Sequence, residues 1–156
     1  MSQNDIYSNP ELYDAIHNGL NLDAKLIKKT ASKINGSVLE LASGTGRLTK
    51  CILELGLNYT GIDNSKTFIK AAINKYADRA KFIFGDMRDF RLDKKFDFIF
   101  IGFNSFLHNL TTQDAKKCLN CINQHLNENG QFLISIYIPD NSFLYRNEKE
   151  LSPVTP

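Results

Sequence analysis

Two carboxylates in this chain directly follow apolar runs, a pattern that suits recognition of a nucleoside. Asp63 ends the stretch GID and Asp86 ends the stretch FGD. A carboxylate at the end of a strand can accept hydrogen bonds from both hydroxyl groups of a ribose. Asp63 stands about 19 residues after Gly44, which is the spacing expected for such a carboxylate. A second carboxylate can accept the amino protons of an adenine, with the Met87 amide donating to a ring nitrogen. The two residues predict an adenosine-binding site.

The stretch VLELASGTGRLT, residues 38–49, places a glycine-containing turn between an apolar run and the start of a helix. Glycine has no Cβ, so the main chain can approach a ligand closely at such a turn. Backbone N–H groups at the start of the helix favour an anionic group. We expect the turn from Ala42 to Gly46 to hold the part of the ligand that is not nucleoside.

Asn104 and His108 follow a third apolar run, FDFIFIGF. An amide at a strand end can orient an acceptor molecule or an amino group of the ligand. A neutral imidazole can remove a proton near neutral pH, although packing within the loop is the alternative for His108. His17 and His125 fall on expected helix surfaces, and we assign them no function.

These residues need a sheet to bring them together, and the order of elements predicts one. Apolar runs alternate with amphipathic helical patterns, and two of the runs are apolar on both faces, as expected for a buried parallel sheet. We expect a parallel α/β sheet covered by helices. The expected strands are 37–42, 59–62, 81–84, 96–103 and 131–138, and the expected helices are about 10–17, 22–34, 48–55, 65–76 and 112–126.

Several details of these elements are specific expectations. The stretch between Gly85 and Phe96 shows no crossover helix, and Gly130 suits the turn after the last helix. The apolar stripes place Leu26, Ile73 and Leu119 on the faces that pack against the sheet.

The chain's length fits one domain with a substantial core, since it has 156 residues, of which 42% are hydrophobic. We expect one domain over residues 1–156. Within it, residues 1–36 form N-terminal helices, 37–139 form the cofactor-binding core, and 140–156 form a polar tail.

Charge and composition argue against several classes of function. The 19 basic and 17 acidic side chains give a net charge of +2, without the cationic face that binding to nucleic acid or a membrane surface needs. No secretory signal or membrane span is present, so we expect a cytoplasmic protein. Cys118 and Cys121 form a C-x-x-C pair in mid-helix without further ligands, so we expect two packing residues and no metal site.

Taken together, the stretches resemble the class I S-adenosylmethionine-dependent methyltransferases over residues 37–139. VLELASGTGRLT is similar to the family's glycine turn, GIDNS to its ribose segment, GDMRDF to its adenine segment, and FDFIFIGFNSFLHNL to the strand and loop that face the methyl group. ELYDAI and GDMRDF look most like small-molecule N- and O-methyltransferases. Ala42 departs from the pattern, because many members carry a further glycine there.

This resemblance implies a doubly wound, Rossmann-like α/β sheet with strand order 3-2-1-4-5 and helices on both faces. It also implies S-adenosylmethionine as the cofactor and methyl transfer to a nitrogen or oxygen of a small molecule. It also implies that Tyr13 closes over the methionine moiety and that the Phe103 ring stabilises the sulfonium charge. Asn104 and His108 are the expected catalytic residues. The expected cofactor-binding residues are Tyr13, Glu40, Ala42, Ser43, Gly44, Arg47, Asp63, Asn64, Asp86, Met87, Arg88 and Phe103.

Other functions fit the residues less well. A nicotinamide or flavin dinucleotide site needs a third glycine where the chain has Thr49. The segment FNSF lacks the prolines of enzymes that methylate base amines, which argues against nucleic acid. The stretch IPDN lacks the aspartate partner of a magnesium site. A module that binds the cofactor without turnover is the alternative from another class.

The expected fifth strand, QFLISIYI, has no later strand to pair with in this sequence. The family continues with a helix and two antiparallel strands, so we expect that the chain is truncated or completes its sheet through another subunit. An apolar edge strand recruits other chains, which makes self-association an expectation. Methyl transfer by the isolated chain is expected to be weak, because the acceptor pocket would lack a wall.

Overall fold

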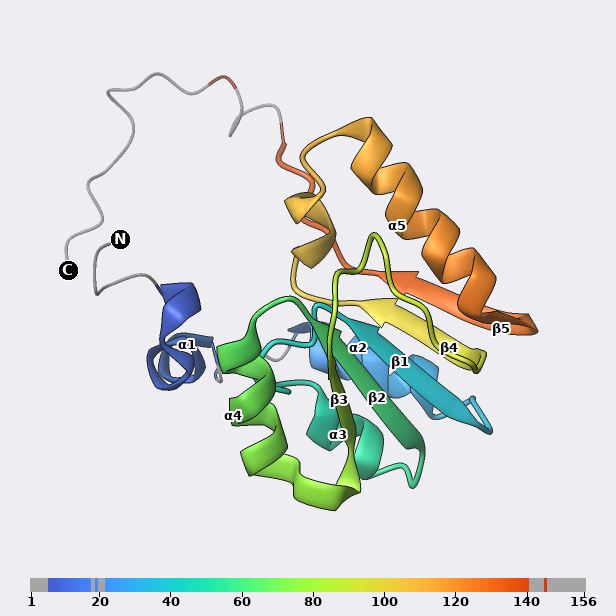
Figure 1. The fold of residues 1–156 in the computed structure, drawn as a ribbon, viewed down its shortest axis with the longest axis horizontal. Coiled ribbons are helices and arrows are strands. Elements are labelled where there is room, and N and C mark those ends of the chain that lie inside the picture. The colour runs from blue at the N-terminus through green and yellow to red at the C-terminus, as the bar shows by residue number, and fades with distance from the viewer. Residues whose placement is uncertain (1–5, 18, 20–21, 141–144, 146–156) are drawn as a thin grey trace.

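The computed structural model describes residues 6–17, 19, 22–140 and 145, and Figure 1 shows their arrangement. A parallel five-stranded sheet has the order β3-β2-β1-β4-β5, which confirms the predicted fold class and strand order. The strands are β1 (Ser37–Leu41), β2 (Asn58–Asp63), β3 (Lys81–Phe84), β4 (Phe96–Ile101) and β5 (Leu126–Ile134), and the helices are α1 (Pro10–His17), α2 (Leu22–Ala31), α3 (Thr49–Leu53), α4 (Lys66–Tyr76) and α5 (Thr112–His125), with short 3-10 turns η1 (Ile6–Ser8), η2 (Ala77–Arg79) and η3 (Ser105–His108).

Alternating side chains of the central strands build a core on each face of the sheet. Leu39 of β1 and Ile99 of β4 pack in a cluster with Ile122 of α5. Val38 and Phe98, one residue earlier on each strand, pack on the opposite face in a cluster with residues of α2 and α3. This two-faced burial explains why these strands are continuously apolar. In Figure 1, α5 lies on one side of the sheet and α2 and α3 lie on the other.

Winding reverses between β1 and β4, and this reversal determines where a ligand can bind. Leu39 pairs with Thr60 on one side and with Ile99 on the other. The chain leaves β1 toward β2 and β3, and it later returns to β4 and β5 on the other side of β1. The loops that follow β1 and β4 therefore diverge beyond the carboxyl ends of these two strands. Open α/β sheets bind their ligands at this point.

Strand ends differ from the predictions where the backbone turns. Strand β4 stops at Ile101, because Phe103 and Asn104 adopt left-handed conformations with φ of 51° and 63°. Strand β5 begins at Leu126, earlier than predicted, and Gly130 lies within it. Phe96 pairs with Leu126 whereas Phe98 pairs with Gln131, so the register shifts between these pairs.

The inward positions predicted for three side chains are wrong, because each helix buries a narrower stripe than its sequence pattern suggests. Leu26, Ile73 and Leu119 are 52%, 45% and 43% exposed. Cys118 and His125 of α5 are buried instead, so the prediction of a surface position for His125 is also wrong. All three cysteines are free thiols.

No helix among the described residues is long and apolar enough to cross a membrane. The predicted polar tail, 140–156, lies outside the described residues except for Asp140 and Tyr145. Segment 85–95 contains no helix, as predicted, and its Phe90 joins the core beside α5.

Candidate functional site

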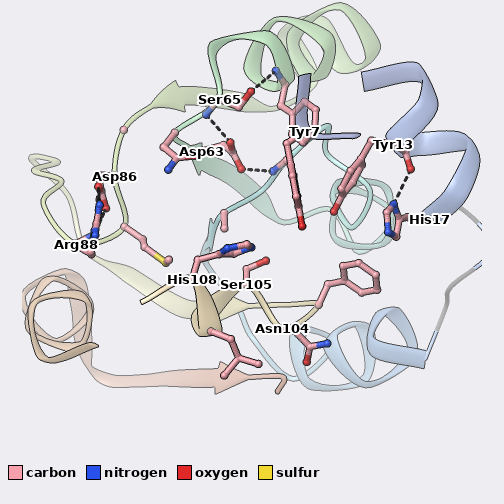
Figure 2. A pocket seen from close by; sticks show the side chains of 18 residues that line it. Tyr7, Tyr13, His17, Asp63, Ser65, Asp86, Arg88, Asn104, Ser105 and His108 are labelled. Carbon is pink, nitrogen blue, oxygen red and sulfur yellow. Dashed lines mark hydrogen bonds and ion pairs between the residues drawn. The ribbon is translucent and has the colours of Figure 1, made fainter. Parts of the chain in front are cut away.

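A cavity of about 760 Å³ opens at the carboxyl ends of the strands. Figure 2 shows it between Asp63, Asp86 and the side chains of α1. Its size falls within the range of about 300–1,000 Å³ typical of small-molecule sites. The lining comprises the predicted residues Tyr13, Ala42, Gly44, Asp63, Asn64, Asp86, Met87, Arg88, Phe103, Asn104 and His108, together with Tyr7, His17, Ser65, Phe68, Gly85, Ser105 and Leu107.

Asp63 lies where β2 meets the glycine turn, and its carboxylate joins two backbone segments. One oxygen accepts a hydrogen bond of 2.8 Å from the Gly44 amide, and the other accepts one of 2.8 Å from the Ser65 amide. Ser65 is the residue that caps α4, since its hydroxyl accepts from the Phe68 amide. Burial raises the pKa of Asp63 despite these donors. The side chain thus supports the turn as well as facing the cavity.

Left-handed conformations give the glycine turn its shape. Gly44 and Gly46 have φ of 56° and 79°, and a Cβ at Gly46 would lie 2.8 Å from the Tyr76 ring. Ala42 also has φ of 56°, which costs a residue with a Cβ about 1–2 kcal/mol. The turn therefore keeps the expected close backbone approach, with local strain at the position where this chain has alanine.

On the β3 side, Asp86 lines the cavity in an ion pair with Arg88. The shortest contact between the two side chains is 2.6 Å. The hydrogen bonds that the Arg88 guanidinium donates to the Asp86 carboxylate lower the pKa of Asp86. Arg88 also lies 3.6 Å from Asp114 of α5. The Met87 sulfur lies 3.9 Å from the Asn109 side-chain nitrogen. Asp86 is thus an ionised acceptor beside a thioether side chain.

The N-terminal segment supplies an aromatic wall, of which the family resemblance indicated only Tyr13. The Tyr13 ring lies 4.3 Å from the His17 ring and 4.9 Å from the Phe68 ring, measured between centroids. His17 also contacts Phe103, so its prediction as a surface residue is wrong. Its position four residues after Tyr13 is the signal that could have revealed it, because such residues share a helix face.

Helix α1 is fastened at the edge of the cavity by Asp14. Its carboxylate accepts hydrogen bonds from the Thr45 hydroxyl of the glycine turn and from Lys75 of α4, the latter at 2.7 Å. This residue was not among the predicted site residues. It links the aromatic wall to the two elements that carry Gly44 and Ser65.

Asn104 and His108 reach the cavity from the loop after β4. The Asn104 side-chain oxygen accepts a hydrogen bond of 2.6 Å from the Tyr137 amide, and in Figure 2 the side chain points away from the centre of the cavity. Its carboxamide therefore joins this loop to the segment after β5. His108 is exposed on η3, and its ring lies 6.1 Å from the Tyr7 ring.

Glu40, Ser43 and Arg47 lie beside the main cavity, where they line an adjoining recess of about 20 Å³. Glu40 is buried and accepts a hydrogen bond from the Tyr59 hydroxyl. Arg47 makes two hydrogen bonds, of 3.0 and 2.5 Å, to Asp23 of α2. Burial by itself lowers the pKa of Arg47, but the hydrogen bonds and the charge of Asp23, together with the nearby Glu40, raise it overall. The guanidinium also lies 4.8 Å from the centroid of the Phe103 ring.

Glu40 should make the stability of the fold depend on pH. Burial raises its pKa from 4.5 to about 8, so the folded chain holds a proton that the unfolded chain has released. The free energy of unfolding should therefore fall as the pH rises from about 4.5 to 8. Glu40→Gln should lack this decline. Urea denaturation of both proteins at pH 5, 7 and 9 measures it, and parallel pH profiles would contradict the prediction.

Fold and cavity together define a Rossmann-like protein with a small-molecule-sized cavity at the switch point of its sheet. The sequence family described as a methyltransferase domain matches residues 38–130. The chain therefore belongs to the class I S-adenosylmethionine-dependent methyltransferase domains, as its motifs predicted.

Individual relatives agree with this assignment. An uncharacterized methyltransferase of Geobacillus sp. (strain WCH70) is 30% identical over 110 residues, covering 70% of this chain and 51% of the relative. The cypemycin N-terminal methyltransferase of Streptomyces sp. is 28% identical over 124 residues, covering 77% and 51%. The glycopeptide N-methyltransferase MtfA, solved with S-adenosyl-L-methionine, has a TM-score of 0.65 and 32% identity, covering 71% and 51%. This chain spans about half the length of these relatives.

Proposed function

We propose that the cavity binds S-adenosylmethionine and that the chain is the cofactor-binding part of a methyltransferase acting on a small molecule. The observation that carries this proposal is the placement of Asp63, Asp86 and the glycine turn around one cavity. Two carboxylates separated by a half-apolar space suit a ligand that has hydroxyl donors at one end and an amino group at the other. Family membership supports the same cofactor.

Each part of the site has a proposed role in binding. Asp63 accepts the ribose hydroxyls, and Asp86 accepts the amino protons of the adenine while the Met87 side chain packs on the base. The turn from Ala42 to Gly46 and the adjoining recess with Glu40 receive the methionine moiety. Tyr13, on the aromatic wall, covers that end.

When bound, S-adenosylmethionine supplies a methyl group on a positively charged sulfur that a nucleophile can displace. The protein's task is alignment and exclusion of water, and good orientation is worth about 7–11 kcal/mol of the barrier. Phe103 offers an aromatic ring near this position, although Arg47 already lies 4.8 Å from its centroid. In this proposal His108 removes a proton from the acceptor. Asn104, which was expected from the sequence to be catalytic, instead positions the loop that carries His108, because its side-chain oxygen accepts from the Tyr137 amide.

We propose a nitrogen or oxygen atom of a small molecule as the methyl acceptor. Nitrogen is favoured by two relatives, the glycopeptide N-methyltransferase MtfA and the cypemycin N-terminal methyltransferase. The described cavity side chains include the aromatic rings of Tyr7, Tyr13 and His17 on the α1 side, which suit a partly apolar acceptor.

Titration calorimetry tests the cofactor assignment directly. We expect saturable binding of S-adenosylmethionine and S-adenosylhomocysteine with one site per chain, and no comparable binding of NADH or FAD. Assays of methyl transfer to a panel of amines and hydroxyls then separate an active enzyme from a binding module without turnover. Binding of NADH in preference to both sulfur ligands would overturn the proposal.

A further inference from the structure

The loop between β3 and β4 carries the residues proposed to read the adenine, yet it has no helix of its own to hold it in place. Asp86, Met87 and Arg88 line the cavity from this loop. A backbone bridge between Asp86 and Asp89 closes its first turn. The remainder of its order must come from contacts with its neighbours, because loops without secondary structure are stabilised by anchoring.

Helix α5 provides these contacts through His125 at its C-terminal end. The His125 side chain is 5% exposed, and its Nε2 accepts a hydrogen bond of 3.0 Å from the Leu92 amide. Its Nδ1 lies 2.7 Å from the carbonyl oxygen of Cys121. A carbonyl oxygen only accepts, so Nδ1 must donate and Nε2 must be free of hydrogen. His125 is thus held as one neutral tautomer by partners on both sides.

Two further contacts place the same helix against the same loop. The Phe90 ring is buried, and its centroid lies 4.4 Å from that of His125. One turn earlier on α5, the Cys121 thiol donates to the Arg88 carbonyl at 3.3 Å. The anchored positions, Arg88, Phe90 and Leu92, directly follow Asp86 and Met87.

We propose that His125 is a positioning residue that fixes this loop for recognition of the adenine base. It acts through the Leu92 amide and the Phe90 ring, and it does not line the cavity itself. The inference rests on the proposed adenine-binding role of Asp86 and Met87. Loss of the anchor should let the loop sample other conformations, so discrimination among bases should fall more than general affinity for the ligand.

The test compares S-adenosylhomocysteine with S-inosylhomocysteine. The inosine compound carries a 6-oxo group in place of the amino group from which Asp86 would accept a hydrogen bond. We expect the wild-type chain to prefer the adenine compound by about ten-fold or more, because a site built for an N–H donor rejects a ligand that lacks it. His125→Phe keeps a ring against Phe90 but loses both hydrogen bonds, and its preference should fall to about three-fold or less. His125→Gln, whose amide oxygen can accept from Leu92, should restore part of it.

Ile52→Val is the matched control, because Ile52 lies in the core on the opposite face of the sheet. This variant should also be less stable than the wild-type chain, but it should keep the wild-type preference for the adenine compound. Amide hydrogen exchange provides a second measurement, with faster exchange expected at residues 86–92 in His125→Phe. If His125→Phe left either the base preference or the amide hydrogen exchange of residues 86–92 unchanged, the role of His125 would be overturned but the proposed function would not. Failure of the wild-type chain to bind S-adenosylhomocysteine would overturn the proposed function as well.

Discussion

Asp63→Ala is expected to weaken the binding of S-adenosylmethionine by about 1–3 kcal/mol, roughly five- to 150-fold in the dissociation constant. The ribose hydroxyls would lose their acceptor, and the Gly44 amide would lose the oxygen that holds the glycine turn. Both losses affect the cavity directly. Titration calorimetry on the folded variant measures the effect, and an unchanged dissociation constant would contradict the assignment of the ribose site.

The same variant should also be less stable, because the Ser65 amide loses its hydrogen bond as well. Asp97→Ala separates the two effects. Asp97 accepts a hydrogen bond of 2.7 Å from the Ser37 amide and another of 2.7 Å from Asn127, but it lies near the amino ends of the strands, away from the cavity. This control should lower the free energy of unfolding without changing the affinity for S-adenosylmethionine.

Asp23→Ala is expected to lower the free energy of unfolding by about 3–5 kcal/mol. The Asp23 and Arg47 side chains are only 9% and 10% exposed, and they form a two-bond ion pair between α2 and the segment after the glycine turn. Removing the carboxylate leaves a buried guanidinium without the group that offsets its loss of hydration. Chemical denaturation measures the change.

Lys28→Ala on the same helix is the matched control. Lys28 pairs with Glu54 at 2.5 Å, the same distance as the shortest contact between Asp23 and Arg47, but both partners are 44% exposed. Water hydrates and screens this pair, so its loss should lower the free energy of unfolding far less than Asp23→Ala does. The double variant Asp23→Leu with Arg47→Met should recover much of the lost stability. Equal losses for Asp23→Ala and Lys28→Ala would show that burial does not govern the first ion pair.

Local sequence was sufficient to predict a parallel α/β sheet and the strand ends that surround the cavity, whereas the strand order came from the family resemblance. Apolar runs that end in small or acidic residues mark the carboxyl ends of strands, and the topology of an α/β sheet brings those ends together. Asp63, Asp86 and Gly44 could therefore be predicted without any knowledge of packing, since each stands at a strand end. The structure places all three on one cavity.

Tertiary structure alone decided what each side chain contacts. His17 and His125 both have the sequence surroundings of surface helix residues, yet one meets Phe103 and the other accepts from Leu92. Likewise, the Asn104 oxygen accepts from Tyr137, and Arg47 turns to Asp23. These partners come from elements distant in the chain. A periodic pattern records which face of an element is apolar, but the polar groups that meet there depend on how the elements pack.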